Sequence, residues 1–150
     1  MNFDKKSTTK IRSKSLFFLA KREHSSWEIK NKLAQAGFNK EQIQQEIEDL
    51  KTQNYLSDER FCEMFIRSRK NMGYGPIKIA YELKKHQFSE QITQQYLNEK
   101  SETWFDLALK VRMKKFGDSS VDDFKEKARQ MRFLQSRGFS NNHIEYAFSR

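Results

Sequence analysis

Three short stretches of the chain share one pattern of apolar and polar positions. They read LAQAGFNKEQI from Leu33, LKKHQFSEQI from Leu83 and LQSRGFSNNHI from Leu134. In each stretch a Phe stands five positions after the Leu, an Asn or Ser follows at once, and an Ile comes four or five positions after the Phe. An apolar residue, a corner aromatic and a side chain that caps the next helix are typical of a helix–helix junction. The pattern predicts three equivalent corners, with their buried positions at Leu33, Phe38, Leu83, Phe88, Leu134 and Phe139.

The sequence around each corner predicts a unit of three helices. In the first unit we expect a short helix from Leu16 to about Glu23. Ser25 and Glu28 have the spacing of a capping box for a second helix, which ends near Gly37. A third helix follows the corner, and the corners recur after 50 and 51 residues. The repetition predicts that the chain contains three copies of the same three-helix unit.

A unit of this size buries little apolar surface by itself, so such units are stable when they stack on their neighbours. We therefore expect an all-α fold, an elongated array of three tandem three-helix repeats that resemble helix-turn-helix units and curve to the right or to the left. The repeats are placed at residues 15–58, 59–100 and 101–150. A flexible basic tail is expected over residues 1–14.

Composition agrees with helices and adds a basic surface. The chain has one proline and five glycines, few for a strand-rich fold, and its 13 phenylalanines argue against disorder. The net charge of +9 is spread evenly, because residues 1–58, 59–100 and 101–150 carry 11, 8 and 10 basic side chains against 8, 5 and 7 acidic ones, which gives +3 each. A long, evenly basic surface suggests a long anionic partner, such as nucleic acid or an acidic protein filament.

The sequence predicts no catalytic site, metal site or cofactor. His24, His86 and His143 are scattered, and Cys62 lies on an apolar helical face beside Phe61 and Phe65, where a cysteine is usually a small buried hydrophobe. No run of about 18 apolar residues is present, so no membrane span is expected. The polar N-terminus lacks the apolar stretch of a signal peptide, and we expect a cytoplasmic protein.

Several motifs together closely resemble the RecX family of bacterial RecA regulators. They are Arg22–Ser25, Leu33–Phe38, Tyr55–Phe61, the arginines Arg67 and Arg69, and Gly73–Leu83. The resemblance is strong over about residues 16–98, while the last third matches in pattern only. Two positions depart from the family pattern: Ser57 replaces an acidic residue, and Gln87 replaces the usual glycine of the second corner. Gln87 would strain that corner if it had to adopt a left-handed conformation.

The resemblance implies a small cytoplasmic protein of tandem three-helix repeats, and we expect a monomeric regulator without enzymatic activity. It would bind the RecA filament on single-stranded DNA, suppress its ATPase, strand-exchange and coprotease activities, and favour its disassembly. No cofactor is implied, and direct contact with the DNA backbone is left open.

Each of the three repeats has one basic cluster, which lies at the end of its first helix. Because they occupy equivalent positions, stacked repeats should present them on one side as a binding surface for the filament. The alternative is that these cations only stabilise the C-terminal end of their helix by interacting with the helix dipole, and each such interaction contributes about 0.3–1 kcal/mol. The predicted binding residues are Lys21, Arg22, Arg60, Arg67, Arg69, Lys70, Lys110, Arg112, Lys114 and Lys115.

A direct DNA-binding module of helix-turn-helix type is the rival interpretation. It would act without RecA and place the third helix of a unit in the major groove. Those helices read EQIQQEIEDL, EQITQQYLNEK and NNHIEYAFSR. They are rich in glutamine or acidic rather than basic, which argues weakly against this interpretation.

Overall fold

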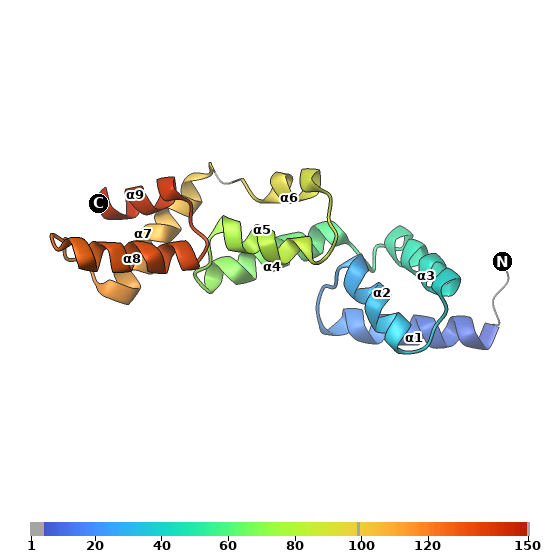
Figure 1. Ribbon diagram of the computed structural model, residues 1–150. Coiled ribbons are helices and arrows are strands. Elements are labelled where there is room, and N and C mark those ends of the chain that lie inside the picture. Colours follow the sequence, from blue (N-terminus) through green and yellow to red (C-terminus); the bar gives the residue numbers. More distant parts are fainter. Residues whose placement is uncertain (1–4, 99, 150) are drawn as a thin grey trace. The chain divides into compact units, whose positions relative to one another are not determined.

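The computed structural model describes residues 5–98 and 100–149 (Figure 1). Within them the protein contains nine α-helices and no strand, so the prediction of an all-helical fold is confirmed. The helices are α1 (Lys5–Lys21), α2 (Ser26–Gln35), α3 (Lys40–Thr52), α4 (Asp58–Asn71), α5 (Pro76–Lys84), α6 (Glu90–Tyr96), α7 (Glu102–Phe116), α8 (Phe124–Ser136) and α9 (Asn141–Ser149).

The first helix begins well before the sequence pattern suggested. α1 starts at Lys5, so the prediction of a flexible tail is wrong for residues 5–14, while residues 1–4 lie outside the described part. Ile11 is buried against α2 and α3, and Arg12 forms an ion pair with Glu46 at 2.7 Å. The amide of Gln42 donates to the hydroxyl of Ser7 at 2.6 Å. Tertiary contacts made by a few residues thus order a stretch whose composition looks like that of a tail.

The chain divides into two compact units, an N-terminal unit up to Met64 and a C-terminal unit from Phe65, and the division falls within α4. The core of the N-terminal unit contains six buried apolar residues from α1, α2, α3 and the turn that follows: Ile11, Ile29, Leu33, Ile43, Leu50 and Leu56. The core around α7, α8 and α9 of the C-terminal unit contains Ala108, Leu134, Phe139, Ile144 and Ala147.

The three corners share a backbone geometry. Gly37, Gln87 and Gly138 stand at equivalent positions directly before the corner Phe, and their φ angles are +96°, +59° and +98°. After the first and third corners, the N–H of the Phe donates to the carbonyl of the Leu five residues earlier, at 3.2 Å in both. Gln87 therefore does adopt the left-handed conformation in which a residue with a Cβ is strained by about 1–2 kcal/mol.

The corners differ in how deeply their side chains are buried. Leu33, Leu83 and Leu134 are all fully buried. Phe139 is buried as well, but Phe38 and Phe88 are only half-buried, so the expectation of three equally buried phenylalanines is wrong. The leucine on the outgoing helix is thus the common anchor of the three corners.

Two glycine turns of the C-terminal unit interlock through their backbones. The N–H of Gly75 donates to the carbonyl of Arg137 at 2.8 Å, and the N–H of Ile77 donates to the carbonyl of Gly138 at 2.9 Å. A Cβ on Gly75 would lie 2.5 Å from the carbonyl carbon and oxygen of Gly138, and one on Gly138 would lie 2.5 Å from Cβ of Lys78. Only glycine allows this approach, which joins the start of α5 to the corner between α8 and α9.

Candidate partner-binding surface

Four of the predicted basic residues meet in one groove of the C-terminal unit. Lys70 comes from the end of α4, and Lys110, Lys114 and Lys115 come from α7; Arg137, which follows α8, joins them. The groove has a volume of about 490 Å³. Every ionisable side chain that lines it is a cation. Clusters from the second and third repeats therefore form one positive site.

The walls of this basic groove are partly apolar. Leu107 and Val111 of α7, Phe133 of α8 and Met72 after α4 line it beside the cations. Leu107, Val111 and Phe133 also pack against the core of the C-terminal unit, so the lining is held by the fold. The groove can therefore contact both charge and hydrocarbon.

Lys70 is held in place on the wall of the groove. Its ammonium lies 4.3 Å from the centre of the Trp104 ring and donates to the hydroxyl of Thr103 at 3.2 Å. Burial lowers the pKa of Lys70, because a charged ammonium loses hydration there. A bound anion would restore part of the stabilisation that this charge has lost.

Arg137 is a groove residue that the sequence interpretation missed. Its guanidinium lies 5.0 Å from the centre of the Tyr74 ring and 5.2 Å from that of Phe133, and it donates to the carbonyl of Met72 at 3.5 Å. Arg137 precedes Gly138, where the other two corners have Ala36 and His86. An arginine unique to the third corner was the available signal.

Lys110 and Lys114 are exposed, and within the described part of the chain neither forms an ion pair or hydrogen bond. Lys115 is exposed too, with its ammonium 5.5 Å from the centre of the Phe133 ring. Arg67 is likewise exposed and has no polar partner among the described residues, but it does not line the groove. Lys110, Lys114 and Arg67 can therefore bind a partner without losing an internal polar contact.

Arg112 is not a surface residue. Its exposed fraction is 3%, and it donates to the side chain of Gln130 at 3.0 Å and to the carbonyl of Ala147 at 3.1 Å. Its guanidinium also stacks over Phe148 at 4.3 Å. The interpretation of Arg112 as a binding residue free of packing is therefore wrong; this arginine joins α7, α8 and α9.

Other predicted binding residues also have structural partners. Arg69 pairs with Glu82 at 2.7 Å and stacks over Phe65. In the N-terminal unit, Arg60 pairs with Glu23 at 2.9 Å and also donates to the side chain and carbonyl of Asn54. Lys21 is exposed, with its ammonium 4.3 Å from the centre of the Phe17 ring. The premise that these residues are unnecessary for packing fails for Arg60 and Arg69.

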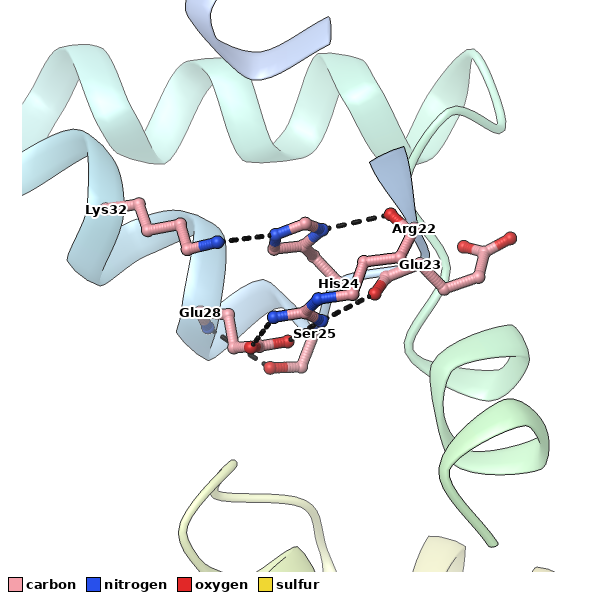
Figure 2. Close-up of polar contacts among 6 residues, drawn as sticks. All are labelled: Arg22, Glu23, His24, Ser25, Glu28 and Lys32. Carbon is pink, nitrogen blue, oxygen red and sulfur yellow. Dashed lines mark hydrogen bonds and ion pairs between the residues drawn. The ribbon is translucent and has the colours of Figure 1, made fainter. Parts of the chain in front are cut away.

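Arg22 belongs to a polar network at the start of α2 (Figure 2). Its guanidinium donates two hydrogen bonds, of 2.6 and 3.1 Å, to the carboxylate of Glu28. Glu28 and Ser25 form the predicted capping box. Burial by itself would raise the pKa of Glu28, but hydrogen bonds from Arg22 and the N–H of Ser25 bring that pKa below its usual value.

His24 lies buried in the same network. Its Nδ1–H donates to the carbonyl of Arg22 at 3.0 Å, and its Nε2 accepts from the ammonium of Lys32 at 2.7 Å (Figure 2). Burial lowers the pKa of His24, and the nearby charges of Arg22 and Lys32 lower it further. Through these two hydrogen bonds the imidazole links the end of α1 to α2.

We found no geometry for a metal or a reactive thiol in the part of the chain that the structure describes. No three His, Cys, Asp or Glu side chains of residues 5–98 and 100–149 are grouped to hold a metal ion. Cys62 is fully buried, and burial with neighbouring carboxylates raises the pKa of its thiol to about 12. None of the helices described has the length and apolar character needed to cross a bilayer.

Comparison with known families identifies the repeats. Models of the first, second and third three-helix domains of RecX match residues 12–50, 57–97 and 102–148, in that order. This chain belongs to the RecX family. The three matches confirm the prediction of three-helix repeats and the resemblance noted in the sequence.

Curated RecX relatives align with almost the whole chain. The regulatory protein RecX of Actinobacillus pleuropneumoniae serotype 5b is 38% identical over 131 residues, which cover 87% of this chain and 85% of the relative. The regulatory protein RecX of Legionella pneumophila (strain Corby) is 36% identical over 140 residues, or 93% of each chain.

Solved RecX structures share the fold at lower sequence identity. The crystal structure of RecX from Lactobacillus salivarius superposes with a TM-score of 0.82 at 19% identity, covering 95% of this chain and 94% of that one. A second crystal structure of regulatory protein RecX gives the same TM-score and identity and covers 100% of this chain. These likenesses support the RecX fold independently of close sequence similarity.

Proposed function

We propose that this protein is a cytoplasmic, monomeric regulator that binds the RecA filament on single-stranded DNA. In this proposal it suppresses the ATPase, strand-exchange and coprotease activities of RecA and promotes filament disassembly, without a cofactor. The observation that carries the proposal is the match of all three RecX domains, in order, along the chain.

The basic groove gives this proposal a physical means of binding. It offers five cations, from Lys70 to Arg137, and no lining carboxylate. A positive surface accelerates encounter with an anionic partner, and binding to a polyanion weakens as salt rises. The N-terminal unit would add contacts to the partner through its predicted binding residues Lys21, Arg22 and Arg60. Arg22 and Arg60 already form internal ion pairs, which limits how much each can contribute to binding.

The direct test is the rate of ATP hydrolysis by RecA on single-stranded DNA, with this protein titrated in. We expect inhibition by the wild type and clearly weaker inhibition by the double variant Lys110→Glu/Lys114→Glu. Both residues are exposed and have no polar partner in the described part of the chain, so the fold should survive.

The matched control is Lys30→Glu/Lys40→Glu, which makes the same change of charge at exposed positions of α2 and α3. This control should inhibit RecA almost as well as the wild type. Equal losses from both double variants would mean that net charge alone drives binding, and the role of the groove would be refuted. A wild-type protein without effect on the ATPase would refute the proposed function itself.

The helix-turn-helix alternative receives less support. In α3, Gln42, Ile43 and Glu46 are buried, and in α9 His143, Ile144 and Ala147 are buried, so part of these two helices packs inward, whereas α6 has no fully buried residue. A duplex-binding titration without RecA distinguishes the two proposals. Strong discrimination between duplex sequences would favour the alternative.

A further inference from the structure

The basic groove combines features that are usually separate on a protein surface. Besides its cations, the lining contains an aliphatic strip made by Leu107 and Val111, which lie four residues apart on one face of α7. An inorganic anion would use the cations and leave this strip unused. The ligand that fits both parts carries negative charges and an aliphatic group.

The aromatic rings beside the groove are not arranged for stacking with nucleic-acid bases. Single-stranded nucleic acid is usually bound by stacking its bases on open aromatic faces. Here the Phe133 ring has Arg137 at 5.2 Å and Lys115 at 5.5 Å, and Phe116 packs edge-on at 5.4 Å. Trp104 is only 1% exposed, with Lys70 over its ring. The chemistry therefore favours a peptide over a nucleic acid.

We propose that the basic groove binds an acidic peptide segment of a partner protein, with an aliphatic side chain seated on Leu107 and Val111. Carboxylates on either side of that side chain pair with Lys110 and Lys114 on α7 and with Arg137 at the end of α8. The volume of about 490 Å³ lies within the range of roughly 300–1,000 Å³ that is usual for ligand clefts. The inference deepens the proposed function, on which it rests, by naming the chemistry that the groove recognises.

The probe is a short fluorescein-labelled peptide in which one leucine is flanked by glutamates and aspartates, and the measurement is fluorescence anisotropy with the full chain. We expect saturable binding that weakens as salt rises. Replacing the leucine of the peptide by serine should weaken binding by about tenfold, because burial of a leucine side chain is worth at least one power of ten in affinity.

Variants of the protein locate the binding site. Lys110→Glu/Lys114→Glu should weaken binding of the leucine peptide by at least about tenfold, since it removes two attractive charges and adds two repulsive ones. Lys30→Glu/Lys40→Glu should change it less than about threefold. Circular dichroism of both variants checks that the helices are retained.

Three outcomes would overturn the inference. The first is equal binding of the leucine and serine peptides, which would reduce the groove to a general anion site. The second is tighter binding of a labelled oligothymidine with the same dependence on Lys110 and Lys114, which would make the groove a nucleic-acid site. The third is absence of peptide binding. In that case, loss of RecA inhibition by the groove variant would leave the proposed function standing, so the two failures are distinguishable.

Discussion

Replacing Gly138 by alanine tests the interlocked turns, and Gly37→Ala is its matched control. Both glycines occupy the same position of their corners, with φ angles of +98° and +96°. A Cβ on Gly37 would meet nothing within 4 Å, whereas one on Gly138 would lie 2.5 Å from Cβ and 2.6 Å from the backbone nitrogen of Lys78. The two substitutions therefore share the backbone strain and differ in the steric overlap.

The expected losses of stability follow from these contacts. Forcing alanine into a left-handed conformation costs about 1–2 kcal/mol, and we expect this cost for both variants. In Gly138→Ala the overlap must also separate the two turns, and it weakens the bonds that Gly75 and Ile77 donate. Two lost backbone hydrogen bonds add roughly 1–3 kcal/mol. Gly138→Ala should thus lose about 2–5 kcal/mol, against about 1–2 kcal/mol for Gly37→Ala.

Hydrogen exchange resolved by mass spectrometry measures these losses in each unit separately. Peptides from α5 and α8 should exchange faster in Gly138→Ala, and peptides from α2 and α3 should show the smaller effect in Gly37→Ala. Equal losses of stability in the two variants would refute the reasoning, because backbone strain alone would then account for both and the steric overlap at Gly138 would cost nothing. An unchanged exchange rate at Ile77 in Gly138→Ala would show that the turns tolerate the methyl group.

Three further predictions concern single residues. Gln87→Gly should stabilise the second corner by about 0.5–1 kcal/mol in urea unfolding, since it relieves a positive φ of 59°; a loss would contradict the strain. Arg112→Met should lose about 2–4 kcal/mol in urea unfolding, because it leaves the carbonyl of Ala147 without its donor, whereas Lys114→Met should lose almost nothing. Acidification through pH 6.5 should lower the melting temperature of the wild type more than that of His24→Asn. The pKa of His24 is lowered in the folded state, so the unfolded chain binds this proton first and the folded state loses stability as the pH falls. Equal changes of melting temperature with pH in the two proteins would contradict this.

The corners were predictable because they depend on local chemistry. A leucine on the outgoing helix, a residue with positive φ and a capping Asn or Ser act within a few residues of one another, so their order in the sequence is their order in space. Leu33, Leu83 and Leu134 are accordingly all fully buried. The depth of each Phe depends instead on which helices cover the corner, and the pattern of one repeat cannot supply that.

The basic residues could not be sorted by sequence because charge does not reveal environment. Arg112 stands among Lys110, Lys114 and Lys115 in the chain, yet the helical period turns it toward α8 and α9, where it is buried. The start of α1 was missed for the opposite reason. Residues 5–14 have a single large apolar side chain, Ile11, and the contacts that order them come from α2 and α3.

The interlocked turns connect the fold to the candidate site. The glycine pair looks, in sequence, like two ordinary turns, but it fixes the start of α5 against the corner between α8 and α9. Met72 and Gly73 on one side and Arg137 on the other line the groove, and the carbonyl of Arg137 accepts the bond from Gly75. Arg137 therefore lines the groove with its side chain and provides a backbone acceptor for the joint. The first corner, where Gly37 faces open space, forms no such joint. One repeated corner thus serves as a simple turn in the first repeat, and in the third it builds a wall of the basic groove.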